Sequence, residues 1–251
     1  MNAWVEVIVK TEDKKIGRAR HQDDDIYAEM FSAILEQRLS PGTKLSEDAL
    51  CKIFNVSRTI IRKVLQRLSH EKVVEIQPNR GAFVAEPTPE EARDVLEARR
   101  IVEAGIMRGA VRAAKPSDIK RLRAMITKEG TAIEQGSHSK WVSLSGDFHL
   151  ELARISGNLA LTEFLRELVS RTSLIHVQYQ SGQMGHQSCS CEEHVDIVKA
   201  LEAGDEEAAV SLMNGHLKAI EASLDLSDTK ADDDLYRIFA KDTVTAAGES
   251  L

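Results

Sequence analysis

Three histidines stand on apolar stripes of predicted helices, at His149, His194 and His216. Around each of them aliphatic residues recur at helical spacing, so each imidazole is expected to face the interior of a helix bundle. A buried imidazole without a partner is costly, and three inward histidines from three helices can converge on one metal ion, with positions left for water or a ligand. The alternative is that each is an ordinary core histidine with a hydrogen-bond partner.

A second group of residues has the chemistry to bind phosphates and bases. Between Ser57 and Ser69 the chain contains four basic residues and no acidic one; they are Arg58, Arg62, Lys63 and Arg67. Ser57, Arg58 and Thr59 at a helix start offer hydroxyls, backbone amides and a guanidinium to a phosphate. Arg62, one turn later, points the same way and can grip O6 and N7 of guanine. The alternative is a solvated helix face opposite an apolar stripe.

The elements that position the basic run are predicted as three helices followed by a hairpin. Helical stripes place the first helix at about residues 25–38 and a short second helix after Ser46. Asn55 can end that helix in a left-handed conformation. The third helix runs to about His70, and its buried face consists of Ile61, Val64, Leu65 and Leu68. Strands at 73–77 and 81–84 flank a turn at 78–80, where Arg80 and Gly81 can approach a neighbouring DNA groove. This order, over residues 25–86, indicates a winged helix-turn-helix.

The histidines belong to a second region. Residues 87–91 are predicted as a linker, because the sequence Glu-Pro-Thr-Pro-Glu breaks the composition there. From 92 to 226 helical stripes follow one another without a strand-like stretch, the last three at about Leu159–Ser181, Glu192–Glu202 and Asp205–Leu224. The predicted fold class is therefore mostly α, with an N-terminal winged helix-turn-helix and a C-terminal all-α antiparallel helical bundle. Residues 1–24 are predicted as a leader and 227–251 as an acidic tail.

Composition limits the protein class. The 251 residues are 42% hydrophobic and 29% charged, which suits a globular chain with a real core. No apolar run approaches the roughly 18 residues of a membrane span, and three cysteines do not form a disulfide framework, so we expect a cytoplasmic protein with no membrane partner. The net charge of −7 excludes a protein that coats nucleic acid everywhere, but not a local basic surface.

The stretch SPGTKLSEDALCKIFNVSRTIIRKVLQRLSHEKVVEIQPNRGAFV closely resembles the GntR family of regulators. Its landmarks are Pro41-Gly42, Leu45-Ser46-Glu47, Val56-Ser57-Arg58-Thr59, Arg62, Leu65, Leu68 and Arg80-Gly81. The resemblance implies that Arg58, Thr59 and Arg62 contact DNA and that Gly81 is the wing-tip glycine. Asp48 departs from the pattern, because the fatty-acid-responsive member has a DNA-contacting arginine there; that contact is absent here and the operator sequence can differ.

The helical remainder resembles the FCD ligand-binding domain. The resemblance implies that His149, His194 and His216 match the three histidines of the metal-binding branch, with zinc as the expected ion and nickel as the alternative. In that branch an acid or amide precedes the first histidine by one turn, and Ser145 stands there instead, which should weaken metal affinity. The branch senses small organic acids, and Arg99 matches its inward arginine. The other interpretation of Arg99 is a solvated i,i+4 pair with Glu103.

These features together predict a transcription regulator rather than an enzyme. A homodimer would place two recognition helices on a double-stranded DNA operator, and a small organic-acid effector bound near Arg99 and Ser145 would change operator affinity. The rival prediction is a metal-dependent hydrolase with a fused DNA-binding module, since three histidines with an open position are what catalytic zinc uses. No convincing general base or nucleophile motif accompanies the histidines.

Overall fold

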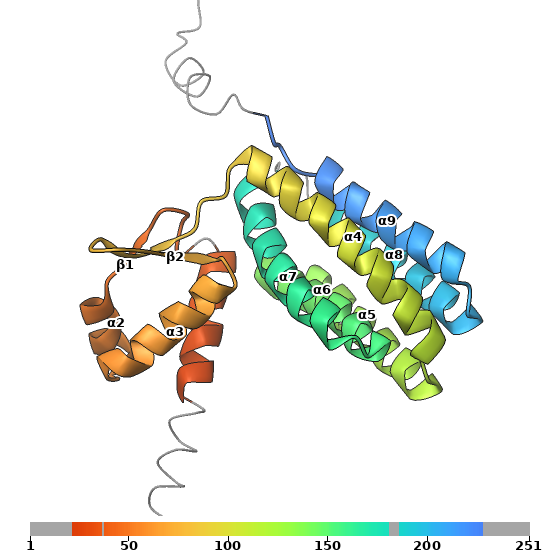
Figure 1. Cartoon of the computed structure of the whole chain (residues 1–251), viewed down its shortest axis with the longest axis horizontal. Coiled ribbons are helices and arrows are strands. Elements are labelled where there is room, and N and C mark those ends of the chain that lie inside the picture. Colours follow the sequence, from red (N-terminus) through yellow and green to blue (C-terminus); the bar gives the residue numbers. More distant parts are fainter. Residues whose placement is uncertain (1–21, 37, 181–185, 228–251) are drawn as a thin grey trace, which may run out of the picture.

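The computed structural model describes residues 22–36, 38–180 and 186–227, and leaves undescribed the side chains of 186–190 (Figure 1). The predicted leader, except for residues 22–24, and the acidic tail beyond Ser227 lie outside this part. Two lobes are present: an N-terminal lobe of short helices with a small sheet, and a larger helical lobe. The predicted fold class is confirmed. No described helix has the length and apolar character to cross a membrane.

The N-terminal lobe contains a helix at 22–35 followed by five shorter elements. These are β1 (Lys44–Leu45), α2 (Glu47–Phe54), α3 (Arg58–His70), β2 (Val74–Gln77) and β3 (Gly81–Val84). The strands form an antiparallel sheet in the order β1-β3-β2. Strand β1 was not predicted, because two residues after a turn carry no periodicity; its pairing of Lys44 with Phe83 depends on a strand far along the chain.

Local sequence signals explain how the helices of this lobe begin and end. Ser46 caps α2 by accepting a hydrogen bond from the Ala49 amide, and Asn55 ends it with φ of 51°, as predicted. The predicted buried face of α3 is confirmed: Ile61, Val64, Leu65 and Leu68 are its buried residues. This face packs on the helix at 22–35 and on the sheet, so the opposite face of α3 is left exposed.

Among the described residues, the helical lobe has six long helices. They are α4 (Pro89–Ala113), α5 (Pro116–Glu134), α6 (His138–Ser156), α7 (Leu159–Tyr179), α8 (His186–Ala203) and α9 (Glu206–Ala222). Aliphatic residues from these helices and Phe148 of α6 form one core. Figure 1 shows α4, α8 and α9 on the side away from the N-terminal lobe and α7 facing it.

Three predicted boundaries differ from those in the structure. Helix α4 begins at Pro89, inside the range predicted as linker, because Thr88 and Glu91 form a capping box that starts the helix there. The first helix of the N-terminal lobe begins by residue 22, so part of the predicted leader is helical. Helix α8 also begins at His186, earlier than the predicted start at Glu192.

The two lobes pack against each other through α7. Leu174 of α7 belongs to the hydrophobic cluster of the N-terminal lobe, and the Ser170 hydroxyl donates to Glu71, which also accepts from Tyr27. A second apolar cluster joins Leu35 of the N-terminal lobe to Trp141 of α6 and Val177 of α7. The helical lobe is therefore in direct contact with the body that carries α3.

We expect Gly109→Ala to destabilise the helical lobe. A Cβ at Gly109 would lie 2.9 Å from Cβ of Ser156, where α4 and α6 cross. Overpacking of this kind costs about 1–3 kcal/mol, more than the roughly 1 kcal/mol that alanine gains over glycine in a helix. Gly130 in α5 is the matched control, because its Cβ would meet nothing within 4 Å. Thermal unfolding followed by circular dichroism should show a lower midpoint for Gly109→Ala and a higher one for Gly130→Ala; equal midpoints would contradict the close approach.

Candidate nucleic-acid interface and metal centre

The exposed face of α3 carries the residues predicted to contact DNA. Ser57, Arg58, Thr59, Arg62 and Lys63 are all exposed. Ser57 occupies the N-cap position, yet its side chain makes no capping hydrogen bond. The start of α3 therefore presents a hydroxyl, free amides and guanidinium groups on one surface, which is the arrangement that a phosphate or a base edge requires.

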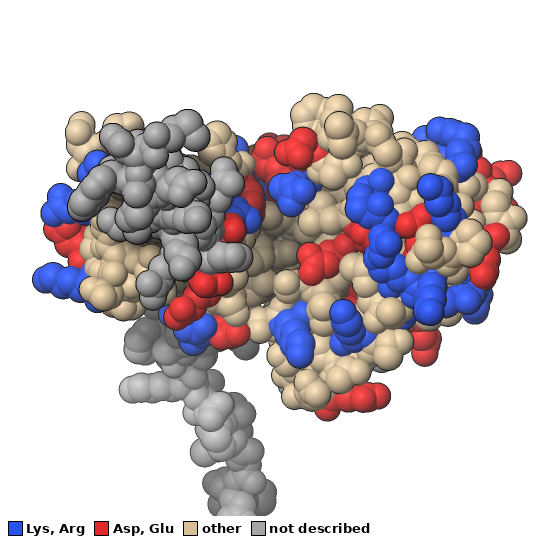
Figure 2. All heavy atoms as spheres, turned by 90° about the horizontal axis from the view of Figure 1, so that it is seen from below, with Lys and Arg blue, Asp and Glu red and all other residues tan. Residues whose placement is uncertain are grey.

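The cations of α3 are each paired with an acid of the same chain. Arg58 lies 2.7 Å from Asp48, and Arg62 donates from Nε to both carboxylate oxygens of Glu47, at 3.0 and 2.9 Å. Lys63 pairs with Asp23, and Arg67 with Asp24. Figure 2 shows basic side chains protruding from the outer edge of the N-terminal lobe beside acidic ones.

The wing tip lies at the β2–β3 turn. Asn79 has φ of 61° and Gly81 has φ of 102°, and the latter is a conformation that a residue with a Cβ rarely adopts. Arg80 is exposed and its guanidinium lies 5.6 Å from the centre of the Phe83 ring. Lys44 lies 5.9 Å from the same ring, so the wing presents a second cation that sequence reasoning missed.

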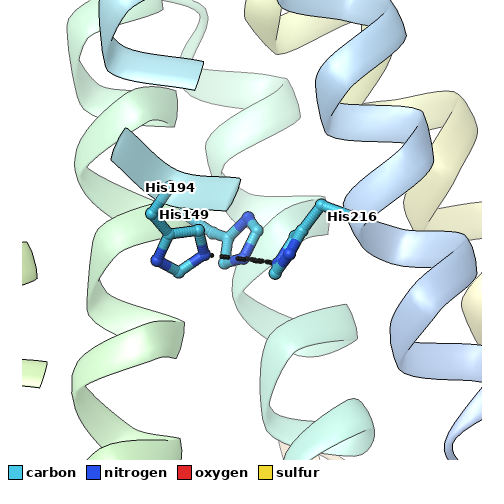
Figure 3. A group of neighbouring side chains, drawn as sticks. All are labelled: His149, His194 and His216. Carbon is cyan, nitrogen blue, oxygen red and sulfur yellow. Dashed lines mark hydrogen bonds between the residues drawn. The ribbon is translucent and has the colours of Figure 1, made fainter. Parts of the chain in front are cut away.

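The three histidines come together from α6, α8 and α9, and all are buried (Figure 3). His216 Nε2 lies 3.2 Å from His194 Nε2 and 3.3 Å from His149 Nε2. Ligand nitrogens about 2.0–2.1 Å from a tetrahedral zinc ion are roughly 3.3 Å apart, so the observed spacing suits one ion. Phe148 stacks on the His194 ring at 4.0 Å between centroids and closes one side of the cluster.

A carboxylate faces the other nitrogen of each ring. His149 Nδ1 lies 2.6 Å from Glu103, His194 Nδ1 lies 2.8 Å from Glu129, and His216 Nδ1 lies 2.7 Å from Glu193. A carboxylate accepts, so each Nδ1 is the protonated nitrogen and each Nε2 of a neutral ring has a lone pair. Three lone pairs that face one another repel, and a cation between them would remove the repulsion. The donor set therefore fits a divalent metal held by Nε2 atoms.

The protonation states support this interpretation. Burial lowers the pKa of His149 to about 3 and that of His194 well below its usual value, so neither ring is charged at neutral pH. Burial opposes ionisation of Glu103, but His149 and Arg99 hold the pKa of its carboxyl at about 2. Burial raises the pKa of Glu129 to about 7, and its Oε1 is buried without a hydrogen-bond partner among the described residues. A cation on His194 would favour the ionised form of Glu129.

Arg99 connects the histidines to a cavity. Its side chain is buried and donates to Glu103 at 2.6 Å, so the pair with Glu103 exists but is not solvated. Arg99 and Glu193 line a cavity of about 70 Å³ between α4, α6, α7, α8 and α9, here named the bundle cavity. Ser145 also lines it, whereas Asp147 lines a separate groove between the lobes. The three histidines are not among the described residues that line this cavity, and they meet it through Arg99 and Glu193.

The carboxylates that hold the imidazoles were not predicted as a group. Glu129 stands on the stripe of Leu122 and Ile126, and a buried acid on an apolar stripe is a signal that could have found it. Glu193 precedes His194 directly, so a helix wheel places it toward a different neighbour, which is His216 of α9. Such pairings depend on which helices are adjacent.

Comparisons with known proteins identify the two lobes. Residues 22–84 match the bacterial regulatory proteins of the gntR family, and residues 94–219 match the FCD domain. The chain is 25% identical over 215 residues to the HTH-type transcriptional repressor RspR of Escherichia coli strain K12, covering 85% of this chain and 93% of that protein. It is 29% identical over 209 residues to the Uxu operon regulator of Haemophilus influenzae, covering 76% and 77%.

A solved structure has the same fold. The Escherichia coli protein McbR/YncC superposes with a TM-score of 0.70 at 20% identity, covering 80% of this chain and 95% of that one. The fold of both lobes is therefore found in another protein.

Proposed function

Because the chain belongs to the GntR family of DNA-binding transcription regulators and has an FCD domain, we propose that a metal ion and a small organic acid in the helical lobe control its affinity for an operator. The observation that carries the proposal is the convergence of three carboxylate-held imidazoles beside a cavity that Arg99 lines. The alternative of a metal-dependent hydrolase is wrong, since both matched families and the curated relatives are regulators.

His149, His194 and His216 would hold the ion through Nε2, and zinc or nickel suits this ligand set. A bound divalent ion supplies positive charge and open coordination positions for an anionic oxygen. Arg99 adds a buried guanidinium in the bundle cavity, held in place by Glu103. An acid bound there would have its carboxylate close to both charges.

Two exposed apolar residues support a homodimer. Ile101 on α4 and Phe164 on α7 are 70% and 63% exposed. Gly105 of α4 lies against Leu161 of α7. Ile101 is one turn before Gly105 and Phe164 is one turn after Leu161, so these antiparallel helices bring the two exposed side chains near each other. Large apolar side chains grouped on a surface are typical of a protein interface. A second copy on this face would place two α3 helices on one two-fold operator.

The effector would act through the contacts between the lobes. Trp141 lines the bundle cavity and also packs with Leu35 of the N-terminal lobe. A ligand that moves Trp141 therefore changes the surface on which the N-terminal lobe rests, and α3 moves with that lobe. Such coupling between two sites typically changes affinity about 5- to 150-fold.

We expect one or more short carboxylic acids to raise the melting temperature of the zinc-treated full chain, and a chelator to abolish the effect. The acid would need both the ion and Arg99, so removing the ion removes most of its binding energy. A thermal-shift screen of short carboxylic acids with and without chelator is the measurement, with the corresponding primary alcohols as controls. Stabilisation that persists without metal would contradict the metal's part in effector binding, whereas no stabilisation by any acid would contradict the effector class.

A further inference from the structure

The bundle cavity has a second polar end, remote from the histidines. Trp141, Ser145 and His149 stand at intervals of four residues on one face of α6, so Trp141 and His149 are about 12 Å apart along the helix axis. His176 of α7 lies beside Trp141, with 5.6 Å between the ring centroids. Both residues line the cavity, and the exposed fraction of Trp141 is only 7%.

Three ring nitrogens at this end have no hydrogen-bond partner among the described residues. Trp141 Nε1 and both ring nitrogens of His176 are buried and make no hydrogen bond with any described residue. Unpaired buried donors and acceptors are unfavourable, and native proteins satisfy nearly all of them. Three such atoms on two neighbouring rings that line one cavity point to a bound molecule as their partner.

The polar groups here are uncharged and of both kinds. Burial lowers the pKa of His176 to about 4, so its ring is neutral at pH 7 and offers one donor and one acceptor. Trp141 offers a donor. Thr172 and Ser173 also line the cavity. Their hydroxyls donate to the carbonyls of Leu168 and Val169, so each hydroxyl oxygen can still accept a hydrogen bond. A hydroxyl, which both donates and accepts, is the group that matches this set, whereas neither Trp141 nor the neutral ring of His176 offers a positive charge to a second carboxylate.

We propose that the Trp141–His176 end of the bundle cavity is a recognition subsite for an uncharged oxygen, so that the effector is a short hydroxy or oxo acid with its carboxylate at the Arg99 end. This inference rests on the proposed effector function. A cavity of about 70 Å³ has room for on the order of five waters at ~15 Å³ each, which suits an acid of roughly four carbons.

The test compares four-carbon acids that differ in the position of an uncharged hydroxyl or in a second carboxylate. Isothermal titration of the zinc-loaded full chain would use butyrate, its 2-, 3- and 4-hydroxy forms, and succinate as probes. We expect at least one hydroxybutyrate to bind more than 10-fold tighter than butyrate, because a buried polar subsite rejects an analogue that leaves it unpaired. Succinate should bind no better than butyrate.

Two variants locate the preference. Trp141→Phe and His176→Phe each keep an aromatic ring and remove the nitrogens, so each should reduce the hydroxybutyrate-to-butyrate ratio toward one while butyrate affinity is retained. Tyr27→Phe is the control, since it removes a half-buried hydroxyl in the N-terminal lobe and should leave the ratio unchanged. Retained butyrate binding also shows that a variant is folded.

The outcomes distinguish a failure of the Trp141–His176 subsite from a failure of the proposed acid effector. If butyrate and its hydroxy forms bind equally, or if both variants keep the original ratio, the subsite is refuted and the acid effector stands. If succinate binds tightest, the far end accepts a charge and the subsite is likewise refuted. If no acid binds to the zinc-loaded protein, the proposed effector function fails and the subsite fails with it.

Discussion

Replacing His194 with alanine is expected to abolish stoichiometric metal binding and to remove a metal-dependent rise of about 10 °C in melting temperature. A ligand at 1,000 times its Kd stabilises the folded state by about 4 kcal/mol, and each kcal/mol shifts the midpoint by about 2–4 °C in a chain of this size. His194 Nε2 is one of three converging nitrogens, so its loss leaves two ligands and an open side. The measurements are metal content after loading and dialysis, and thermal unfolding with zinc and with chelator.

The partner carboxylates give a graded version of the same experiment. Glu129→Gln leaves the three histidines in place but weakens the acceptor that orients His194, so metal affinity should fall about 10- to 100-fold rather than disappear. His70→Ala is the matched control, because His70 is exposed on α3 and lies outside the cluster. Equal metal content in the wild type and in His194→Ala would contradict the proposed metal site. A wild type that takes up no metal under any loading condition would contradict it as well.

Arg62→Ala should weaken binding to a selected operator about 5- to 150-fold at matched salt. A guanidinium that reads guanine contributes about 1–3 kcal/mol of discrimination, and its loss should also relax the preference at that base. The operator is obtained first by selection from randomised duplexes, in which a homodimer should enrich two inverted half-sites. Binding is then measured by fluorescence anisotropy across a series of salt concentrations.

A matched arginine in the helical lobe separates base recognition from a general charge effect. Arg112 is exposed and ion-paired with Glu206, as Arg62 is with Glu47, so Arg112→Ala makes the same change in net charge. Lys63→Ala provides the intermediate case: it should weaken binding to all sequences alike and reduce the salt slope by no more than about one, because Lys63 exchanges Asp23 for the phosphate. If Arg62→Ala and Arg112→Ala bind the operator equally well, α3 is not the helix that reads it.

Much of the architecture followed from residue periodicity. The buried face of α3, the left-handed Asn55 and the inward direction of the three histidines all depend on neighbours within two helical turns, which a sequence displays directly. Periodicity states which face of a helix is buried but not what it meets. Glu129 lies 65 residues from His194, and its pairing depends on α5 and α8 being adjacent, which no local pattern records.

The charge pattern is the clearest case of this limit. In the sequence α3 is a run of cations without acids, and the acids at Asp23 and Asp24 lie in residues 22–35, of which only the first three were predicted as leader. In the folded chain that segment is helical, and it returns to α3 so that Asp24 lies 2.7 Å from Arg67, 43 residues away. The local excess of positive charge is therefore smaller in space than along the chain.

The paired cations of α3 have a consequence for the search along a genome. Each arginine or lysine already carries a tethered counterion, so DNA must exchange a carboxylate of the protein for a phosphate instead of only displacing mobile salt. The freed carboxylates remain beside the duplex and draw cations back, which makes the net ion release, and hence the slope of log K against log salt, smaller than four phosphate contacts would give. On random sequence no base contact compensates for the exchange. We therefore expect the four acids to act as an intramolecular competitor that shortens residence on non-operator DNA and leaves more of the protein for the operator.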